Sequence, residues 1–375
     1  MVILGPRQVG KTTLARAIGE EWAPGAVYLD LERPADARRM EDADAYLRTL
    51  LPRLGVIDEA QRLPELFPIL RGVIDDHRLL GSDAGQFLLL GSAWIDLVMR
   101  TSDSLAGRVS VVELTGVNVD EAAQVDIDAR TLWVRGGFPR ALLAADDTVS
   151  LRWRTDLIQS YLERDVAMFA PRVPSTALRR MWTMLAHNTG GLFNASQLGA
   201  NLGLSNQTVS RYVDLLGQLG LTRRLEPWFT NAGKRVTKSP KIYVRDSGLL
   251  HALLELETLH DVLGHPSVGA SFESFAVESL VNATPRLRPH FYRTARGDEI
   301  DLVLVRGGQP QIAVEIKLST SPTISAGFFR ACDDLDITRR YLVHPDSSLA
   351  PYQRSGVTVV GLLELVTTLR NEETA

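Results

Sequence analysis

The sequence predicts an α/β fold, in which a parallel sheet is followed by a mainly helical region and then by a second α/β region. Three stretches of the chain predict this order. Residues 1–118 alternate apolar runs with helical segments, as a parallel sheet with crossover helices requires. Residues 150–250 are spaced mainly as helices, and strand-like runs return after about residue 270. We therefore expect three domains, at residues 1–150, 151–255 and 256–375.

The composition is typical of a globular chain. Of 375 residues, 45% are hydrophobic and 23% are charged, and no apolar run is long enough to span a membrane. The first residues lead directly into a strand, so no signal peptide is expected, and a single cysteine, Cys332, excludes an internal disulfide framework. We therefore expect a cytoplasmic protein. Only four residues precede the first glycine-rich segment, so we expect the natural start to lie upstream.

The glycine-rich segment at residues 5–12, Gly-Pro-Arg-Gln-Val-Gly-Lys-Thr, is a complete G-x-x-x-x-G-K-[ST] phosphate loop. The apolar run 2–4 precedes it and the helically spaced segment 13–18 follows, which is the strand–loop–helix context that the motif needs. Glycines let the backbone bend so that its N–H groups face phosphate oxygens, and the following helix adds its positive end. The sequence therefore predicts a parallel sheet of the P-loop NTPase type.

The residues of this loop have separate expected roles. Lys11 is expected to reach the β- and γ-phosphates of ATP, and the Thr12 hydroxyl to bind Mg²⁺. The expected nucleotide-binding residues are Gly5, Pro6, Arg7, Gln8, Val9, Gly10, Lys11, Thr12 and Thr13.

A second motif, at residues 54–59, is an apolar run that ends in two acids, Asp58 and Glu59. It is typical of a buried parallel strand with carboxylates at its carboxyl end, which is a Walker B pattern. Asp58 is expected to hold the Mg²⁺ shell and Glu59 to polarise the attacking water, so the site is expected to hydrolyse ATP. The alternative is a strand that ends in a solvated acidic turn.

A third apolar run, at residues 87–92, ends in the small polar residue Ser92. Ser92 is a candidate catalytic residue that would sense the γ-phosphate or the attacking water. The alternative is that it caps the helical segment that begins at Ala93.

Residues 175–245 carry ten Lys or Arg and two Asp or Glu, a net charge of +8 in a chain whose net charge is −4. The same segment contains a helix-turn-helix pattern, followed by a wing-like strand. The helices are expected at 195–202 and 206–216, the turn at 203–205 and the strand at 221–228. The pattern predicts a winged-helix region.

In a DNA-binding interpretation of this region, one set of side chains faces a major groove and another binds phosphates. The groove set is Asn206, Gln207, Ser210 and Arg211, and the phosphate set is Arg223, Arg224, Lys234, Arg235 and Lys238. The alternative is a structural or protein-binding module with a solvated basic face.

The C-terminal region places acids in a D-x(n)-E-x-K pattern. Strands are expected at 291–293, 299–305 and 312–317, with a hairpin turn at 306–309. Strand alternation puts Glu315 and Lys317 on one face, with Asp301 on the neighbouring strand and Glu273 on the preceding helix. Two carboxylates can bind Mg²⁺ or Mn²⁺, and the lysine can stabilise the attacking water or the phosphate. This is the arrangement of PD-(D/E)xK phosphodiesterases, and the alternative is an ordinary ion pair in a domain that serves in binding.

Together these segments resemble the bacterial and archaeal AAA-type ATPases with a DUF4143 C-terminal region, the AAA_14 group. The resemblance covers nearly the whole chain and is carried by residues 5–13, 57–61, 90–92, 105–109, 136–139, 163–165, 246–249, 272–275, 299–301 and 314–317. It implies a P-loop ATPase joined to a winged helix and a restriction-endonuclease-like domain. It also implies that Arg108 is a candidate for contacting phosphate or for acting in trans, with a structural ion pair as the alternative.

Three functions are open from the sequence. The first is an ATPase that acts on DNA and carries a metal-dependent nuclease. The second is a regulatory ATP switch that binds DNA or protein and cuts nothing, and the third is an ATP-dependent binding module for a protein client. The expected cofactors are ATP and Mg²⁺, with Mg²⁺ or Mn²⁺ at the C-terminal acids. The expected partners are a nucleotide and DNA, with a homo-oligomer left open and no membrane.

Overall fold

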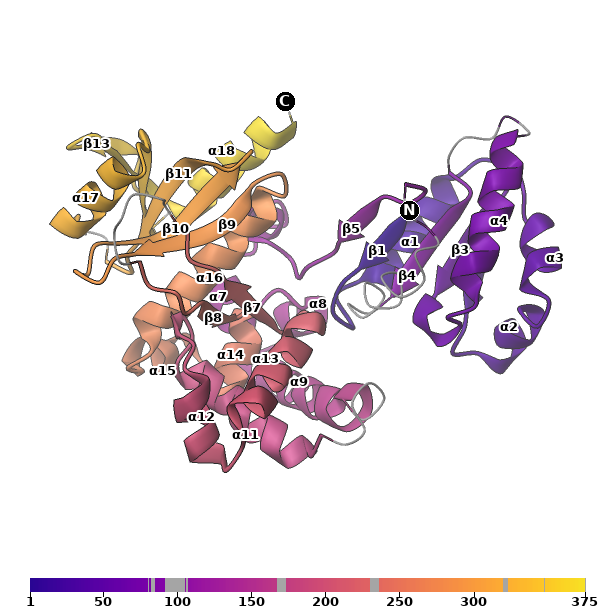
Figure 1. Ribbon diagram of the computed structural model, residues 1–375, viewed down its shortest axis with the longest axis horizontal. Coiled ribbons are helices and arrows are strands. Elements are labelled where there is room, and N and C mark those ends of the chain that lie inside the picture. The colour runs from indigo at the N-terminus through magenta and orange to yellow at the C-terminus, as the bar shows by residue number, and fades with distance from the viewer. Residues whose placement is uncertain are drawn as a thin grey trace. The chain divides into compact units, whose positions relative to one another are not determined.

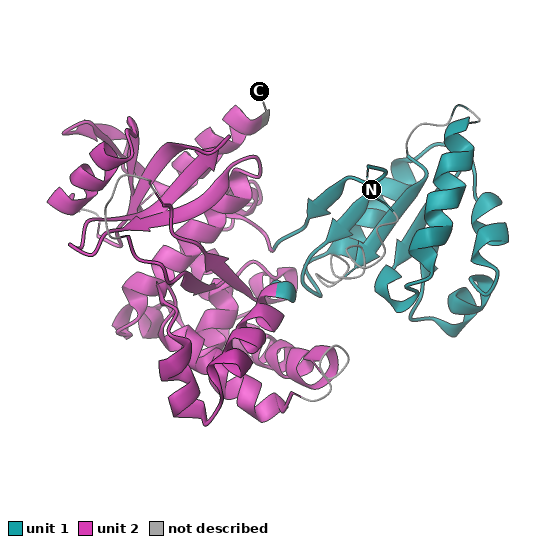
Figure 2. Cartoon of the chain, in the orientation of Figure 1, with its two compact units in different colours: residues 1–115, 218–220 teal, residues 116–217, 221–375 magenta. Residues whose placement is uncertain are grey.

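The chain divides into two compact units (Figures 1 and 2). Unit 1 is Met1–Thr115 with Gln218–Gly220, and unit 2 is Gly116–Gly217 with Leu221–Ala375. The computed structural model describes residues 1–79, 81, 85–91, 105, 107–166, 173–229, 236–319, 323–346 and 348–374. Unit 1 contains the glycine-rich loop, and unit 2 contains the basic segment and the C-terminal acids.

Unit 1 is built on a five-stranded parallel sheet with the strand order β2-β3-β4-β1-β5. Its elements are β1 (Val2–Leu4), α1 (Lys11–Glu21), β2 (Ala26–Asp30), α2 (Pro34–Arg39), α3 (Ala43–Arg48), β3 (Leu54–Asp58), η1 (Ala60–Arg62), α4 (Leu66–Leu79), β4 (Phe87–Gly91) and β5 (Val111–Glu113). The predicted α/β fold with a parallel sheet is confirmed. Strand β4 lies between β1 and β3, the two strands that carry the phosphate loop and the acidic pair.

Helices cover both faces of this sheet, which explains why its central strands are continuous apolar runs. Successive side chains of a strand point to opposite faces. Val2 accordingly packs in the cluster that contains α3 and α4, whereas Ile3 packs in the cluster that contains Ala15 of α1. Strands β3 and β4 are buried at every position, as strands covered on two sides must be.

Unit 2 contains two further sheets among helices. The three-stranded sheet has the order β6-β8-β7 and is antiparallel, and the six-stranded mixed sheet has the order β13-β14-β12-β11-β10-β9. The elements are α6 (Val119–Ala123), α7 (Ala129–Arg135), α8 (Pro139–Leu142), α9 (Asp147–Ser160), the π-helical turn η2 (Tyr161–Asp165), α11 (Ser175–His187), β6 (Gly191–Leu192), α12 (Ala195–Leu202), α13 (Asn206–Gln218), β7 (Thr222–Leu225), β8 (Lys241–Val244), α14 (Ser247–Leu253), α15 (Leu259–Gly264), α16 (Val268–Ala283), β9 (Arg288–Arg293), β10 (Glu299–Arg306), β11 (Gln309–Ile316), α17 (Ala326–Asp334), β12 (Arg339–His344), β13 (Tyr352–Arg354), β14 (Val357–Gly361) and α18 (Leu362–Thr374). Within the described ranges, no helix has both the length and the apolar character that a membrane span requires.

The helix-turn-helix pattern forms α12 and α13 where the sequence predicts them. The Asn194 side chain accepts a hydrogen bond from the Gln197 N–H and caps the start of α12. Gly203 ends α12 in the left-handed region, at φ 68°, which glycine adopts without strain. The Ser205 hydroxyl then accepts a hydrogen bond from the Thr208 N–H at 3.2 Å, which caps α13.

The predicted hairpin near the C-terminal acids is also present. Strands β10 and β11 pair antiparallel, and Leu302 pairs with Val314. Gly307 and Gly308 connect them with φ values of 60° and 78°, the left-handed conformations that a tight hairpin turn needs. This register places Asp301 and Glu315, the next residues along each strand, at the same level of the sheet.

An apolar core joins the helical and sheet regions of unit 2. It includes Trp133 from α7, Phe272 from α16 and Leu302 from β10. Two segments that carry the family resemblance, 136–139 and 246–249, also meet within this unit. The Asp246 carboxylate accepts hydrogen bonds from the Gly137 N–H at 2.7 Å and the Leu249 N–H at 2.8 Å. These segments therefore hold α7 against α14, which is a structural role.

Candidate functional site

The phosphate loop connects the carboxyl end of β1 to α1. Gly10 immediately precedes the helix in the left-handed region at φ 105°, and Gln8 has φ 66°. A Cβ atom at Gly5 would lie 2.0 Å from the Leu114 carbonyl oxygen, so only glycine fits at the start of the loop. Both glycines of the motif are thus required by the backbone, as the sequence predicts.

Lys11 is buried at the first position of α1, with its ammonium inside the loop. Its Nζ donates to the Gly5 carbonyl at 2.9 Å and to the Pro6 carbonyl at 2.8 Å. The charge is therefore held at the centre of the loop by neutral acceptors. A phosphate oxygen is a stronger acceptor for an ammonium than a carbonyl oxygen is, because the hydrogen bond is charge-assisted on both sides.

Thr12 and Asp58, the two predicted magnesium ligands, meet although they lie 46 residues apart in sequence. The Thr12 hydroxyl donates to Asp58 Oδ2 at 2.7 Å, and the Glu59 N–H donates to Asp58 Oδ1 at 2.9 Å. The buried Asp58 side chain also accepts a hydrogen bond from the Tyr28 hydroxyl on the neighbouring strand. Burial, followed by the hydrogen bond to Asp58, raises the pKa of Tyr28, so the phenol remains a donor.

Glu59 turns the chain out of strand β3. Its backbone lies in the left-handed region at φ 54°, which is uncommon for a residue other than glycine. The Glu59 carboxylate accepts a hydrogen bond from the Gln61 side chain. The acid that is expected to polarise water is thus held at the carboxyl end of β3, next to Asp58.

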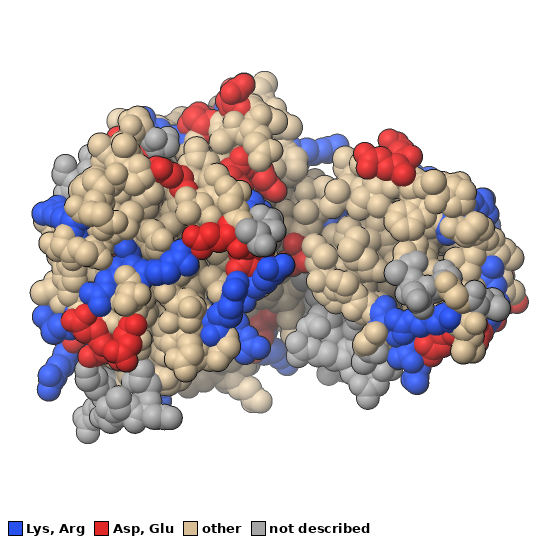
Figure 3. All heavy atoms as spheres, turned by 90° about the horizontal axis from the view of Figure 1, so that it is seen from above, with Lys and Arg blue, Asp and Glu red and all other residues tan. Residues whose placement is uncertain are grey.

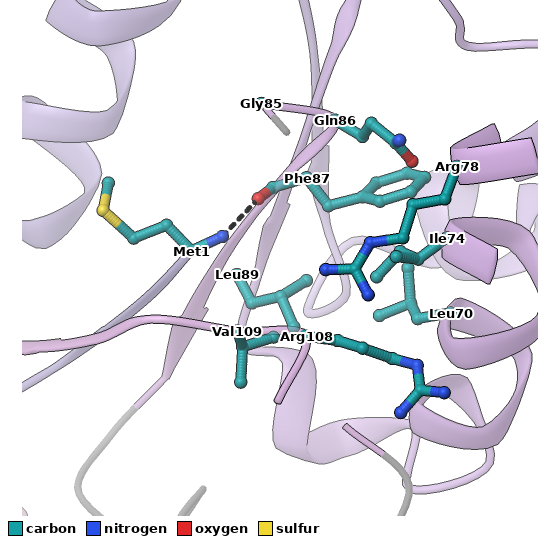
Figure 4. A pocket seen from close by; sticks show the side chains of 10 residues that line it. All are labelled: Met1, Leu70, Ile74, Arg78, Gly85, Gln86, Phe87, Leu89, Arg108 and Val109. Atoms are coloured by element: carbon teal, nitrogen blue, oxygen red, sulfur yellow. Dashed lines mark hydrogen bonds between the residues drawn. The ribbon is translucent and has the colours of Figure 1, made fainter. Parts of the chain in front are cut away.

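Of the other two catalytic candidates of unit 1, only Arg108 is among the described residues. Ser92 follows β4 and lies outside the described residues. Arg108 forms two hydrogen bonds with Asp75, at 2.7 and 2.9 Å. It lines a cavity of about 50 Å³ together with Met1 and Phe87, at the amino ends of β1 and β4 (Figure 4). Because the phosphate loop lies at the opposite end of β1, Arg108 is not placed to contact phosphate on its own chain, and a trans role stays a prediction.

The basic residues of unit 2 make several internal ion pairs. Arg223 Nη2 lies 3.0 Å from Glu278 Oε2 on α16, and Arg245 Nε lies 3.1 Å from the same oxygen. Burial alone would raise the pKa of Glu278, but the two guanidinium groups lower it overall. Arg224 pairs with Asp214 at 3.2 Å and with Glu226 at 3.0 Å.

These pairs change the interpretation of the +8 charge. Part of the positive charge in residues 175–245 is balanced by acids from outside the segment, so the sequence total overstates the charge that faces solvent. Figure 3 looks onto the molecule from above the view of Figure 1, and so not onto α12; on the face that it shows, Lys and Arg side chains are interspersed with Asp and Glu. Of the predicted DNA-binding residues, Gln207 and Arg211 are exposed on α13, whereas Lys234 and Arg235 lie outside the described residues.

The predicted C-terminal acids do converge. Asp301 Oδ2 accepts a hydrogen bond from the Ile316 N–H at 2.9 Å, and Lys317 Nζ lies 2.8 Å from Glu315 Oε1. Burial, followed by the negative charges of Glu273 and Glu315, raises the pKa of Asp301 to about 8. Burial also raises the pKa of Glu315.

A lysine that the sequence patterns did not single out lies among these acids. Lys241, the first residue of β8, is 4% exposed. Its Nζ lies 2.9 Å from Glu299 Oε1, 3.1 Å from Glu273 Oε1 and 3.8 Å from Asp301 Oδ1. Although burial lowers its pKa, the three carboxylates raise it overall, so the ammonium stays charged. The signal that could have identified it is a charged residue at the start of an otherwise buried apolar strand.

The residues at this cluster do not fit a divalent metal in the observed arrangement. Within the part of the chain that the structure describes, no group of three or more His, Cys, Asp or Glu side chains is placed to hold a metal ion. Glu273 and Asp301 instead face the Lys241 ammonium. The four residues predicted to form a Mg²⁺ or Mn²⁺ site, Glu273, Asp301, Glu315 and Lys317, therefore lie together. Their carboxylates, however, already face lysine side chains and are not free to bind a metal.

Three family models match consecutive parts of the chain. Residues 1–123 match an AAA domain, AAA_14. Residues 126–260 match a domain of unknown function, DUF8612, and residues 268–365 match another, DUF4143. The nucleotide site thus lies in the first match, and the acids Glu273, Asp301 and Glu315 lie in the third.

Curated relatives and solved structures add to these matches. The uncharacterized protein Rv2008c of Mycobacterium tuberculosis is 41% identical over 359 residues, which cover 96% of this chain and 79% of that protein. The Walker-type ATPase PABY2304 of Pyrococcus abyssi is 14% identical, with a TM-score of 0.45, and the match covers 68% of this chain and 90% of that one. The Aeropyrum pernix ORC1 protein in complex with DNA is 13% identical, with a TM-score of 0.31, and the match covers 68% of this chain and 86% of that one. The AAA_14 and DUF4143 matches and this mycobacterial relative show that the chain belongs to the family of AAA-type P-loop ATPases that carry a DUF4143 region.

Proposed function

We propose that the chain binds ATP with Mg²⁺ at the phosphate loop and hydrolyses it. The observation that carries this proposal is the 2.7 Å hydrogen bond between Thr12 Oγ1 and Asp58 Oδ2. It joins the two motifs at one end of the sheet, beside a loop whose centre holds the Lys11 ammonium. A hydroxyl and a carboxylate at this position are the magnesium ligands of P-loop NTPases.

Each residue would contribute in a different way. Thr12 and Asp58 would hold Mg²⁺, which supplies charge neutralisation on the β- and γ-phosphate oxygens when it is bound. Lys11 would place its positive charge on the same oxygens, and the N–H groups of the loop would bind the remaining ones. Glu59, next to Asp58 at the strand end, would polarise the attacking water and accept its proton.

Phosphate release from ATP by the full chain tests this function. We expect release in the presence of Mg²⁺ and none when EDTA removes the metal, because the charge of the triphosphate is then not neutralised. Equal rates with and without divalent metal, or no release under either condition, would contradict the proposal.

We propose duplex DNA as the partner of α13, as a second function. The order α11, β6, α12, α13, β7, β8, with β6 paired to β8, is the order of a winged helix. Gln207 and Arg211 are both exposed and lie four residues apart, so they share one face of α13. Side chains on such a face can reach base edges and phosphates in a major groove.

Reversing the charge of Arg211 tests the DNA proposal. We expect Arg211→Glu to weaken binding to a mixed-sequence duplex roughly tenfold at low salt, since a contact to DNA is worth about 1–3 kcal/mol. Fluorescence anisotropy over a series of salt concentrations measures it. Arg152→Glu, at an exposed position on α9, is the matched control and should bind as the unaltered chain does. If both variants lose affinity equally, or if the unaltered chain binds no duplex at low salt, α13 is not a DNA-binding helix.

The surroundings of the C-terminal acids favour a switch over a nuclease. These acids contact Lys241 and Lys317, so we assign no cleavage to them. ATP binding and hydrolysis in unit 1 would then regulate a DNA-binding unit 2, which is the second of the three functions considered from the sequence.

A further inference from the structure

We propose that Lys241 is the built-in cation of the carboxylate cluster Glu273, Glu299, Asp301 and Glu315, and that it closes this cluster to divalent metals. The cluster would then hold strand β8 against the DUF4143 region through ionic contacts. This inference concerns unit 2 alone and does not depend on ATP hydrolysis in unit 1.

The Lys241 ammonium lies in a buried position among carboxylate oxygens. A buried ammonium is costly unless oxygen partners replace its hydration shell. Lys241 Nζ has carboxylate partners from two elements, Glu273 on α16 and Glu299 on β10, at 3.1 and 2.9 Å. Its third carboxylate neighbour, Asp301, lies 3.8 Å away. Three carboxylate oxygens thus surround one positive charge, which is how a metal cation would be surrounded.

Glu273 also accepts a hydrogen bond from Tyr243, a second residue of β8. Tyr243 lies two residues after Lys241, so both side chains leave β8 on the same face. The Tyr243 hydroxyl donates to Glu273 Oε1 at 2.6 Å, the same oxygen that lies 3.1 Å from Lys241 Nζ. Both donors are buried. A metal that bound this oxygen would have to displace a buried lysine and a buried tyrosine from it.

Positive side chains balance most of the negative charge of the cluster. Its four carboxylates are balanced in part by Lys241, by Lys317 at 2.8 Å from Glu315, and by Arg293 at 3.6 Å from Glu299. The remaining charge is at most one negative unit. A divalent cation in addition to these groups would make the buried cluster positive, so the electrostatic attraction that normally draws a metal to clustered acids is already satisfied.

The paired strands β7 and β8 are anchored to α16 at a second point. Helix α16 carries Glu278, five residues after Glu273, and Glu278 binds Arg223 from β7 and Arg245 just after β8. The two strands are therefore tied to one helix through two buried ionic clusters. Lys241 cannot leave the carboxylates by a movement of its strand unless the second cluster also breaks.

Manganese binding tests the proposal. All variants are made in an Asp58→Asn chain, called the background chain, because this change removes the carboxylate that would bind metal at the ATP site. Free Mn²⁺ is followed by its electron paramagnetic resonance signal during titration of the full-length protein. We expect the background chain to bind no Mn²⁺ at the C-terminal acids. The further change Lys241→Ala should create one Mn²⁺ site per chain. This site should bind Mn²⁺ at least tenfold more tightly than any site of the background chain does. Lys317→Ala is the matched comparison, because it removes the same charge from the cluster but leaves Lys241 on Glu273 and Glu299; any Mn²⁺ site that it creates should be weaker than that of Lys241→Ala.

Two results of this titration would overturn the proposal. One is a background chain that already binds Mn²⁺ as tightly as the folded Lys241→Ala variant does. The other is a folded Lys241→Ala variant that gains no affinity. Since the substitution removes a buried charge partner, its fold is checked by circular dichroism, and Lys241→Met, which keeps the apolar stem, is prepared beside it. A further measurement needs no change at Lys241: the thermal midpoint of the background chain should be independent of Mn²⁺. A rise with Mn²⁺ that Asp301→Ala removes would show a metal site in the native cluster.

Discussion

Replacing Lys11 with alanine is expected to weaken ATP binding severely. The Lys11 ammonium is buried inside the loop and held by the carbonyls of Gly5 and Pro6, so the loop loses the positive charge at its centre. Hydrogen bonds to charged groups contribute about 1.5–3 kcal/mol each, so the loss of the ammonium from two phosphate groups should weaken affinity on the order of 100-fold or more. Calorimetric titration with ATP and Mg²⁺ measures this directly.

Lys238→Ala is the control for this experiment, because it removes an exposed lysine in unit 2 and leaves the loop unchanged. It should bind ATP with the affinity of the unaltered chain. If Lys11→Ala retained that affinity, the loop would not be the nucleotide site, and the proposed function would have to move to another part of the chain.

Replacing Glu59 with glutamine is expected to separate ATP binding from hydrolysis. Glutamine has the size and shape of glutamate, so the turn after β3 and the neighbouring Asp58 should be preserved. It cannot accept a proton from water, and the loss of a general base costs about 100- to 10,000-fold in rate. We therefore expect unaltered ATP affinity with phosphate release reduced to that extent.

Phosphate release and ATP affinity are measured on the same preparations, beside Glu65→Gln as the control. Glu65 is an exposed acid that lies six residues after Glu59 and just before α4. Its replacement removes the same charge from the same part of unit 1 and should change neither quantity. Normal turnover in Glu59→Gln would show that another acid polarises the water.

The nucleotide site could be predicted from the sequence because its geometry is local. Gly5, Gly10 and Lys11 lie within one strand–loop–helix unit, and the backbone there requires the residue types that the motif specifies. Asp58 could be placed beside Thr12 because the carboxyl ends of parallel strands meet at one edge of a sheet. Tyr28 could not, since its role depends on β2 pairing in register with β3, and a single tyrosine in a strand gives no sign of that.

The charged residues of unit 2 were harder to interpret because their partners are distant in sequence. Arg223 was predicted to bind phosphate, yet it pairs with Glu278, which lies 55 residues away. No sequence pattern marks Lys241, although it lies among the predicted metal ligands. A net charge counted along a segment cannot show which side chains turn inward, because their counter-charges come from other elements.

A single-turnover experiment tests the central claim most directly. The full chain is mixed, in excess, with radiolabelled ATP and Mg²⁺, and the nucleotide is analysed as a function of time. The proposed arrangement of Lys11, Thr12, Asp58 and Glu59 predicts that the bound ATP is converted to ADP and phosphate, and that EDTA prevents the conversion. Bound ATP that is recovered intact in the presence of Mg²⁺ would contradict it.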